Sequence, residues 1–144
     1  MSEMRKVGDV GVSLKDYVAT VEIQRPPHNF FDFTLIRTLA DVFDELDGDE
    51  NCRVILLCAA GKSFCAGANF GDGSSIDKDG NAKNAPNRGD SGHLYQEAVR
   101  LISNKKPVVG AIQGAAIGGG LGLAMVPDLR VACPEARFAA NFTR

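Results

Sequence analysis

Three consecutive glycines, Gly118, Gly119 and Gly120, follow a short apolar run rich in β-branched residues at 108–112. Such a run has the length of a buried strand, and the residues from 114 to 125 favour a turn that leads into a glycine-rich helix. Glycine inside a helix costs up to about 1 kcal/mol relative to alanine, so a contact or a ligand should offset three of them. The glycines therefore either present free amides to an anion or a carbonyl oxygen, or let the helix pack closely on a sheet.

A second stretch of small residues, SFCAGANF at 63–70, comes directly after the wholly apolar run at 54–58. Small residues let a ligand or another backbone approach the main chain closely. If a helix starts near Ala68, its first amide hydrogens have no partners within the helix and point at whatever lies above the strand end. The alternative is a tight connection between strand and helix that binds nothing.

Hydrophobic periodicity predicts the other elements. It indicates a hairpin at 7–24 that turns at 15–17, an amphipathic helix from Asp32 or Thr34 to Gly48, a helix at 94–103, and short strands at 129–132 and 137–139. The run at 54–58 is typical of a strand covered on both faces. Helices between buried strands indicate an α/β layer with parallel crossovers. Residues 1–144 are expected to form one domain, with a mobile loop at 71–92, where nearly all residues are polar or small.

Composition and charge exclude several classes of protein. A net charge of −2 argues against a nucleic-acid-binding surface, and neither a dinucleotide fingerprint nor a P-loop is present. The 4 cysteines form no CxxC pair and no histidine lies at metal-ligand spacing, so we expect reduced cysteines and no metal. The N-terminus is not of signal-peptide type, which predicts a cytoplasmic protein. Residues 108–126 could be considered as a membrane span, but their glycines and Gln113 favour strand, turn and helix.

Taken together, these stretches resemble the crotonase superfamily, also called the enoyl-CoA hydratase/isomerase family. The matching pieces, in order, are Arg25-Pro26 with Asn29-Phe30, RVILL at 53–57, KSFCAGAN at 62–69, KPVV at 106–109, QGAAIGGG at 113–120, Asp128, and EARF at 135–138. The resemblance covers the chain but only the N-terminal half to two-thirds of the family fold. It implies an α/β, crotonase-like spiral of ββα units without the C-terminal helical trimerisation region, and a homotrimer or hexamer for a full-length protein.

The resemblance also implies a function. Family members are lyases or isomerases of fatty-acid or related acyl-CoA metabolism, which take a coenzyme A thioester as substrate and need no prosthetic group. Two backbone amides hold the thioester oxygen and stabilise the enolate; by position these belong to Ala68 and Gly119. The residues that the resemblance assigns to binding of the substrate and its coenzyme A are Arg25, Ala66, Ala68, Asn69, Phe70, Gly118 and Gly119.

The chain departs from the family at the acid–base positions. Hydratases of the family use two glutamates, and the matching positions here are Gly122 and Phe142. Neither residue transfers a proton, which argues against the ordinary hydratase route and leaves a non-catalytic acyl-CoA-binding protein as the alternative. His93 is a further catalytic candidate, because a few members that act on aromatic or halogenated thioesters carry a basic residue in this neighbourhood. The competing interpretation of His93 is a solvated surface histidine.

Overall fold

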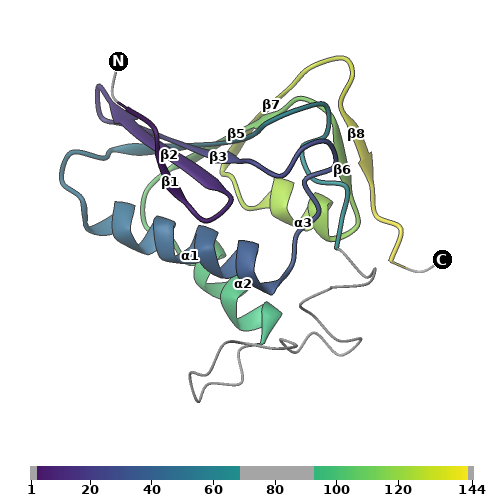
Figure 1. Cartoon of the computed structure of the whole chain (residues 1–144), viewed down its shortest axis with the longest axis horizontal. Helices are drawn as coiled ribbons and strands as arrows, with labels where there is room; N and C mark the ends of the chain where they lie inside the picture. Colours follow the sequence, from purple (N-terminus) through teal and green to yellow (C-terminus); the bar gives the residue numbers. More distant parts are fainter. Residues whose placement is uncertain (1–2, 69–92, 143–144) are drawn as a thin grey trace.

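The computed structural model describes residues 3–68 and 93–142, and the loop predicted at 71–92 lies outside them. Its main feature is a 6-stranded sheet in the spatial order β1-β2-β3-β4-β5-β7, with α1 and α2 side by side on one face (Figure 1). The strands of this sheet are β1 (Arg5–Val7), β2 (Val10–Lys15), β3 (Val18–Ile23), β4 (Val54–Ala59), β5 (Val108–Ile112) and β7 (Leu129–Ala132). The first three pair antiparallel, and β3, β4, β5 and β7 run parallel. The predicted α/β layer with parallel crossovers is therefore present.

The predicted hairpin is formed by β2 and β3. Its two turn residues, Asp16 and Tyr17, have positive φ angles of 49° and 66°, as in a two-residue turn whose twist matches that of the strands. The structure adds β1, which pairs with β2 and begins before the expected hairpin. Three exposed or half-exposed residues do not show enough alternation to predict a strand, so β1 was not apparent from the pattern.

Helix α1 (Phe33–Gly48) begins and ends where the sequence indicates. Of the two candidate N-caps, Asp32 is the one used: its carboxylate accepts a hydrogen bond from the Leu35 amide at 2.9 Å. At the other end, the Lys106 ammonium donates to the carbonyl oxygens of Leu46 and Asp49, which caps the helix from the segment before β5. The ends of α1 are thus fixed by side chains close and distant in sequence.

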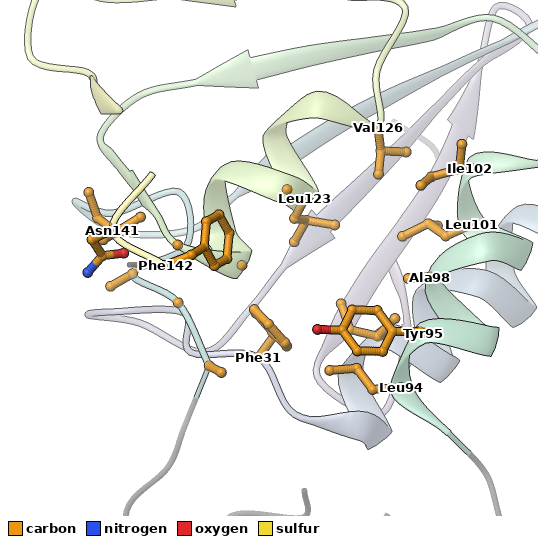
Figure 2. Close-up of a pocket in the computed structure, with 18 residues that line it drawn as sticks. Phe31, Leu94, Tyr95, Ala98, Leu101, Ile102, Leu123, Val126, Asn141 and Phe142 are labelled. Carbon is orange, nitrogen blue, oxygen red and sulfur yellow. The ribbon is translucent and has the colours of Figure 1, made fainter. Parts of the chain in front are cut away.

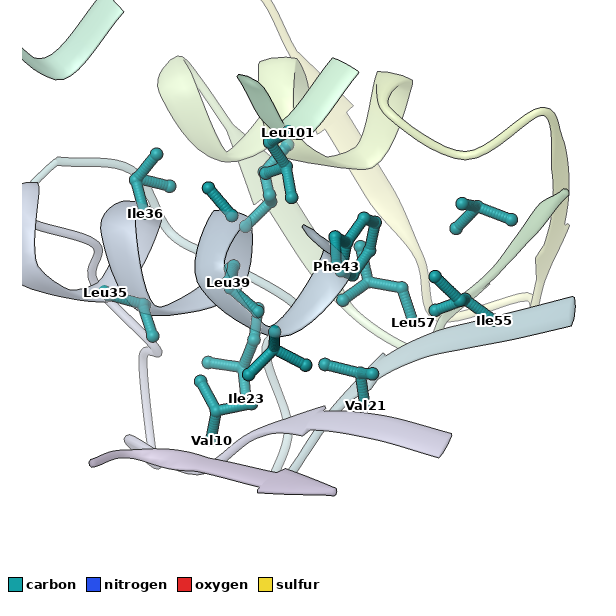
Figure 3. Close-up of a cluster of buried hydrophobic side chains, with 14 of the residues drawn as sticks. Val10, Val21, Ile23, Leu35, Ile36, Leu39, Phe43, Ile55, Leu57 and Leu101 are labelled. Atoms are coloured by element: carbon teal, nitrogen blue, oxygen red, sulfur yellow. The ribbon is translucent and has the colours of Figure 1, made fainter. Parts of the chain in front are cut away.

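The core lies between α1, α2 and one face of the sheet (Figure 3). Leu39 and Phe43 of α1 and Ile55 and Leu57 of β4 are fully buried there, and each such side chain contributes roughly 1.5–3 kcal/mol through burial. The alternate residues of β4 are only half-buried. The prediction that β4 is covered on both faces is therefore wrong for the part of the chain that the structure describes, because the described helices α1 and α2 pack on the same face.

Two further strands, β6 (Ala115–Ile117) and β8 (Arg137–Ala139), pair in parallel as a separate sheet. The pattern predicts β8, but at 114–125 it predicts a turn that leads into a helix, and it misses β6. Ala116 pairs with Phe138 on one side and forms a bridge with Cys65 on the other. This strand exists because distant segments pair with it, and three small residues give no periodic signal of their own.

The apolar stretch at 108–126 is divided between β5, β6 and the short helix α3 (Gly119–Met125). The stretch is thus divided into separate elements, as the sequence indicates, with β6 where a turn was expected. Within residues 3–68 and 93–142, no helix has both the length and the apolar character needed to cross a membrane.

Candidate active site

A pocket of about 710 Å³ opens between α2 (Leu94–Ile102), α3 and the segment that ends at Ala68 (Figure 2). Its walls are mostly apolar: Leu101 of α2 and Leu123 of α3 face each other across it, and Phe31 lies beside them. Among the described residues that line the pocket, only Tyr95 and Asn141 have polar side chains. The described lining consists of Phe31, Ile36, Ala66, Gly67, Ala68, Leu94, Tyr95, Ala98, Leu101, Ile102, Ile117, Gly118, Gly119, Gly122, Leu123, Val126, Asn141 and Phe142.

The orientation of the Ala68 amide follows from a bond made by its neighbour. Ala68 forms an isolated parallel bridge with Phe31, and the Phe31 amide donates to the Gly67 carbonyl at 3.0 Å. The Gly67 carbonyl and the Ala68 N–H belong to one trans peptide group, so they point in opposite directions. The Ala68 N–H therefore points away from Phe31, and it has no hydrogen-bond partner within residues 3–68 and 93–142.

The same reasoning applies to Gly119 at the start of α3. The Gly118 carbonyl accepts from the amides of Leu121 at 3.0 Å and Gly122 at 3.2 Å, so it points along the helix. The Gly119 N–H lies on the opposite side of that peptide group and points out of the helix. It too has no partner among the residues that the structure describes. Ala68 and Gly119 both line the pocket, so two residues of its wall carry an N–H group without a partner in the described part of the chain.

Each of the three consecutive glycines has its own structural reason. Gly118 has a φ of +55°, which favours glycine, and an ideal Cβ on Gly119 would lie 2.4 Å from the Phe31 ring. A Cβ on Gly120 would lie 2.0 Å from the Cys65 carbonyl oxygen. Gly120 therefore allows close packing, which is one of the two explanations considered from the sequence. Presentation of an amide to an anion or a carbonyl oxygen stays a prediction.

The other predicted binding residues are distributed unequally. Ala66 and Gly118 line the pocket, whereas Asn69 and Phe70 lie outside the described residues. Arg25 is not among the described lining residues. Its guanidinium pairs with Asp9 at 2.7 Å and with Asp32 at 3.0 Å, so it also ties the loop after β3 to the start of α1.

His93 is the N-cap of α2 and does not belong to the described pocket lining. Its Nδ1 accepts a hydrogen bond from the Tyr95 amide at 3.2 Å, and the two rings stack with centroids 5.4 Å apart. A catalytic role for His93 stays a prediction. Tyr95, whose side chain does reach the pocket (Figure 2), was not singled out from the sequence, since one tyrosine on an amphipathic helix gives no distinctive spacing.

Both positions that match the hydratase glutamates, Gly122 and Phe142, line the pocket. An ideal Cβ on Gly122 would have no heavy atom within 4 Å, so a longer side chain has room there. Phe142 is 69% exposed. Neither side chain can carry a proton.

Cys65 lies fully buried in the segment that leads to Ala68. Burial raises the pKa of its thiol to about 11. The thiol therefore stays protonated at neutral pH and acts as a small apolar side chain, as expected from the sequence. All four cysteines are free.

The family model for enoyl-CoA hydratase/isomerase matches residues 13–144. The chain belongs to the enoyl-CoA hydratase/isomerase family. The Mycobacterium bovis protein named "Probable enoyl-CoA hydratase echA6" is 38% identical over 130 residues, which are 90% of this chain and 49% of that protein. The 1,2-epoxyphenylacetyl-CoA isomerase of Escherichia coli is 33% identical over 130 residues, which cover 88% of this chain and 48% of the enzyme.

A solved structure confirms the fold of this family member. The enoyl-CoA hydratase/isomerase from Pseudoalteromonas atlantica T6c superposes with a TM-score of 0.77 at 29% identity, over 94% of this chain and 51% of that chain. The predicted α/β, crotonase-like fold and the predicted family are therefore correct. The chain spans about half the length of the relatives that it matches.

Proposed function

We propose that the pocket binds an acyl-CoA thioester with its carbonyl oxygen between the N–H groups of Ala68 and Gly119. Loss of a proton from the carbon next to the carbonyl would move negative charge onto this oxygen, and the two donors would stabilise the resulting enolate. Donors that are already aimed at a developing oxyanion are usually the largest catalytic contribution, and losing one costs about 3–4 kcal/mol in comparable sites. The observation that carries the proposal is a pair of backbone amides, on residues that line one mostly apolar pocket, with no partner among the residues that the structure describes.

The names of the relatives support this substrate class, because both an enoyl-CoA hydratase and an epoxyphenylacetyl-CoA isomerase act on coenzyme A thioesters. We extend the proposal to binding of the substrate and its coenzyme A by Arg25, Ala66, Asn69, Phe70 and Gly118. The whole protein would work in the cytoplasm as a homotrimer or hexamer, on acyl-CoA of fatty-acid or related metabolism, without a prosthetic group.

The proton-transfer step distinguishes two forms of this proposal. In an enzyme, a group other than Gly122 and Phe142 moves the proton, and Tyr95 has the one titratable side chain among the described lining residues. Proton transfer by such a group suits an isomerase, or a lyase other than a hydratase, better than it suits an ordinary hydratase. The alternative is a non-catalytic acyl-CoA-binding protein, which is favoured by the absence of a carboxylate at both matching positions.

Two substitutions at Gly119 test the role of its amide. Alanine and proline both add a Cβ beside the Phe31 ring, but only proline removes the N–H. Calorimetric titration with crotonyl-CoA would measure binding, and continuing slow heat after each injection would report turnover. Infrared spectroscopy of bound crotonyl-CoA would measure how far the thioester carbonyl is polarised.

We expect Gly119→Pro to lose the polarisation of the carbonyl and at least about 100-fold of any turnover relative to Gly119→Ala. Equal carbonyl frequencies and equal turnover in the two variants would contradict the proposal. Binding of crotonyl-CoA without continuing heat would argue against hydration by the unsubstituted protein. Conversion of none of a panel of enoyl-, β-keto- and malonyl-type thioesters would select the non-catalytic alternative.

A further inference from the structure

Two side-chain amides from distant segments donate into the turn that follows β4. The first is Asn29, which is fully buried and has a φ of +49°. Its Nδ2 donates to the carbonyl oxygens of Ala60 and Ser63, each at 2.7 Å. Its Oδ1 accepts from the Arg25 amide at 2.9 Å, so every hydrogen-bonding atom of this side chain is engaged. A buried amide that is fully bonded is held in one orientation.

The second amide is that of Gln113, the residue after β5. Its Nε2 lies 2.9 Å from the carbonyl oxygen of Ala59, 3.0 Å from that of Gly61 and 3.1 Å from that of Ser63. Its Oε1 is buried and has no hydrogen-bond partner in the described structure. A buried acceptor without a partner lowers the free energy of unfolding by about 1–3 kcal/mol. The conformation of Gln113 therefore satisfies its N–H donors and leaves its Oε1 acceptor unsatisfied.

The two amides converge on one carbonyl. The Ser63 carbonyl accepts from both Asn29 and Gln113, which come from the loop before α1 and from the residue after β5. The backbone of Gly114 also lies against this turn, since a Cβ there would be 1.8 Å from the Lys62 carbonyl oxygen. The turn is therefore fixed from the loop before α1 and from the end of β5.

This turn leads directly to the Ala68 amide. Two residues after Ser63, the Cys65 amide donates to Ala115 at 2.9 Å and its carbonyl accepts from Ile117 at 3.1 Å. Those bonds fix Cys65 beside β6, three residues before Ala68. A shift of the turn would be passed along this short connection to the peptide group that carries the Ala68 N–H.

We infer that Asn29 and Gln113 are positioning residues that hold the turn at 59–63 and thereby aim the Ala68 N–H into the pocket. The inference rests on the proposed function, in which that N–H binds a thioester oxygen. Neither side chain lines the pocket, so both act through the backbone that they hold. A misplacement of about 1 Å in a reacting group can cost about 100-fold in rate.

Gln113 is a better position than Asn29 for a test substitution, because its backbone conformation is an ordinary one. Gln113→Leu removes the two N–H donors of the side chain and keeps a similar side-chain volume. Gln96→Leu makes the same chemical change on an exposed position of α2 outside the pocket lining. Val21→Ala removes packing from the fully buried core of β3 and controls for a general loss of stability.

The first measurement needs no ligand. Hydrogen exchange of the Cys65 and Ile117 amides should be about tenfold faster in Gln113→Leu than in the unsubstituted protein, with the amides of β2 and β3 unchanged. Gln96→Leu should change exchange neither at Cys65 and Ile117 nor in β2 and β3. Val21→Ala should speed exchange in β2 and β3 as well as at Cys65 and Ile117. Unchanged exchange at Cys65 and Ile117 in Gln113→Leu would overturn the inference.

The second measurement uses crotonyl-CoA. Gln113→Leu should keep its affinity within about threefold and lose most of the carbonyl polarisation, with about 10–100-fold lower kcat and unchanged KM where turnover occurs. Polarisation like that of the unsubstituted protein would overturn the positioning role. Absence of any carbonyl shift in the unsubstituted protein would instead refute the proposed function, and hydrogen exchange would still decide whether the two side chains hold the turn.

Discussion

The carbonyl oxygen of Cys65 lies against the backbone of Gly120, 2.0 Å from the point that a Cβ on that glycine would occupy. This contact brings together the segments that contain Ala68 and Gly119, because Ala68 follows Cys65 closely and Gly119 precedes Gly120. The two segments are therefore in direct backbone contact. The energetic cost of glycine in α3 is offset by this close approach.

Gly120 and Gly122 of α3 serve as a test position and its control, because only Gly120 has a close backbone neighbour. Gly120→Ala places a methyl group against a carbonyl that cannot move without disturbing β6, so we expect a loss of roughly 3 kcal/mol or more in the free energy of unfolding. Gly122→Ala meets nothing within 4 Å and should gain up to about 1 kcal/mol through helix propensity. Urea unfolding of both variants measures the difference. Equal stabilities would show that α3 is not packed on the Cys65 carbonyl.

Restoring carboxylates at the two family positions should create hydratase activity. In the Gly122→Glu and Phe142→Glu double variant, two acid–base groups would line the pocket in which the thioester is proposed to bind. We expect hydration of crotonyl-CoA at least about 100-fold above the unsubstituted protein, the usual contribution of positioned proton transfer.

The isosteric double variant, Gly122→Gln with Phe142→Gln, is the control for this gain. It has the same shape but cannot exchange a proton at neutral pH. Hydration rates followed by loss of enoyl absorbance should separate the two double variants. Similar rates would contradict the assignment of these positions to the acid–base role.

The buried Cys65 thiol predicts how stability depends on alkaline pH. Burial raises its pKa to about 11 from the ordinary value of 9.0, so above pH 9 the unfolded chain releases a proton that the folded chain retains. Its contribution to stability is complete below pH 9 and is lost as pH rises toward 11, by at most about 1.4 kcal/mol per pH unit. Unfolding measured from pH 8 to 11 should show a steeper decline than in Cys65→Ala. Parallel curves would mean that this thiol ionises as easily in the folded protein as in the unfolded chain.

Elements with a strong local signal could be predicted from the sequence. Helix α1 follows from the spacing of Leu35, Leu39 and Phe43 and from Asp32 as its cap, and its bounds are those of the structure. Strands β4 and β5 follow from their β-branched runs. In contrast, β6 depends on pairing with Cys65 and Phe138, and no local pattern announces a partner that is distant in the chain.

The candidate site divides in the same way. Small residues after buried strands indicated an accessible backbone in both stretches, and the resemblance to the family assigned the two amides to Ala68 and Gly119. The resemblance pieces also contained Asn29 and Gln113, but nothing in them showed that both amides reach the same Ser63 carbonyl. Tyr95 could not be selected because its approach to the pocket depends on how α2 lies relative to α3 in the fold.

The sequence by itself determined the family, the order of the main elements and the lack of carboxylates at the two hydratase positions, because these depend on residue identity and local periodicity. The tertiary structure decided where the two amides point. That direction follows from the Phe31 bond to the Gly67 carbonyl and from the helix bonds to the Gly118 carbonyl. A peptide group has two opposite faces, and only a partner brought from elsewhere in the fold determines which face remains free.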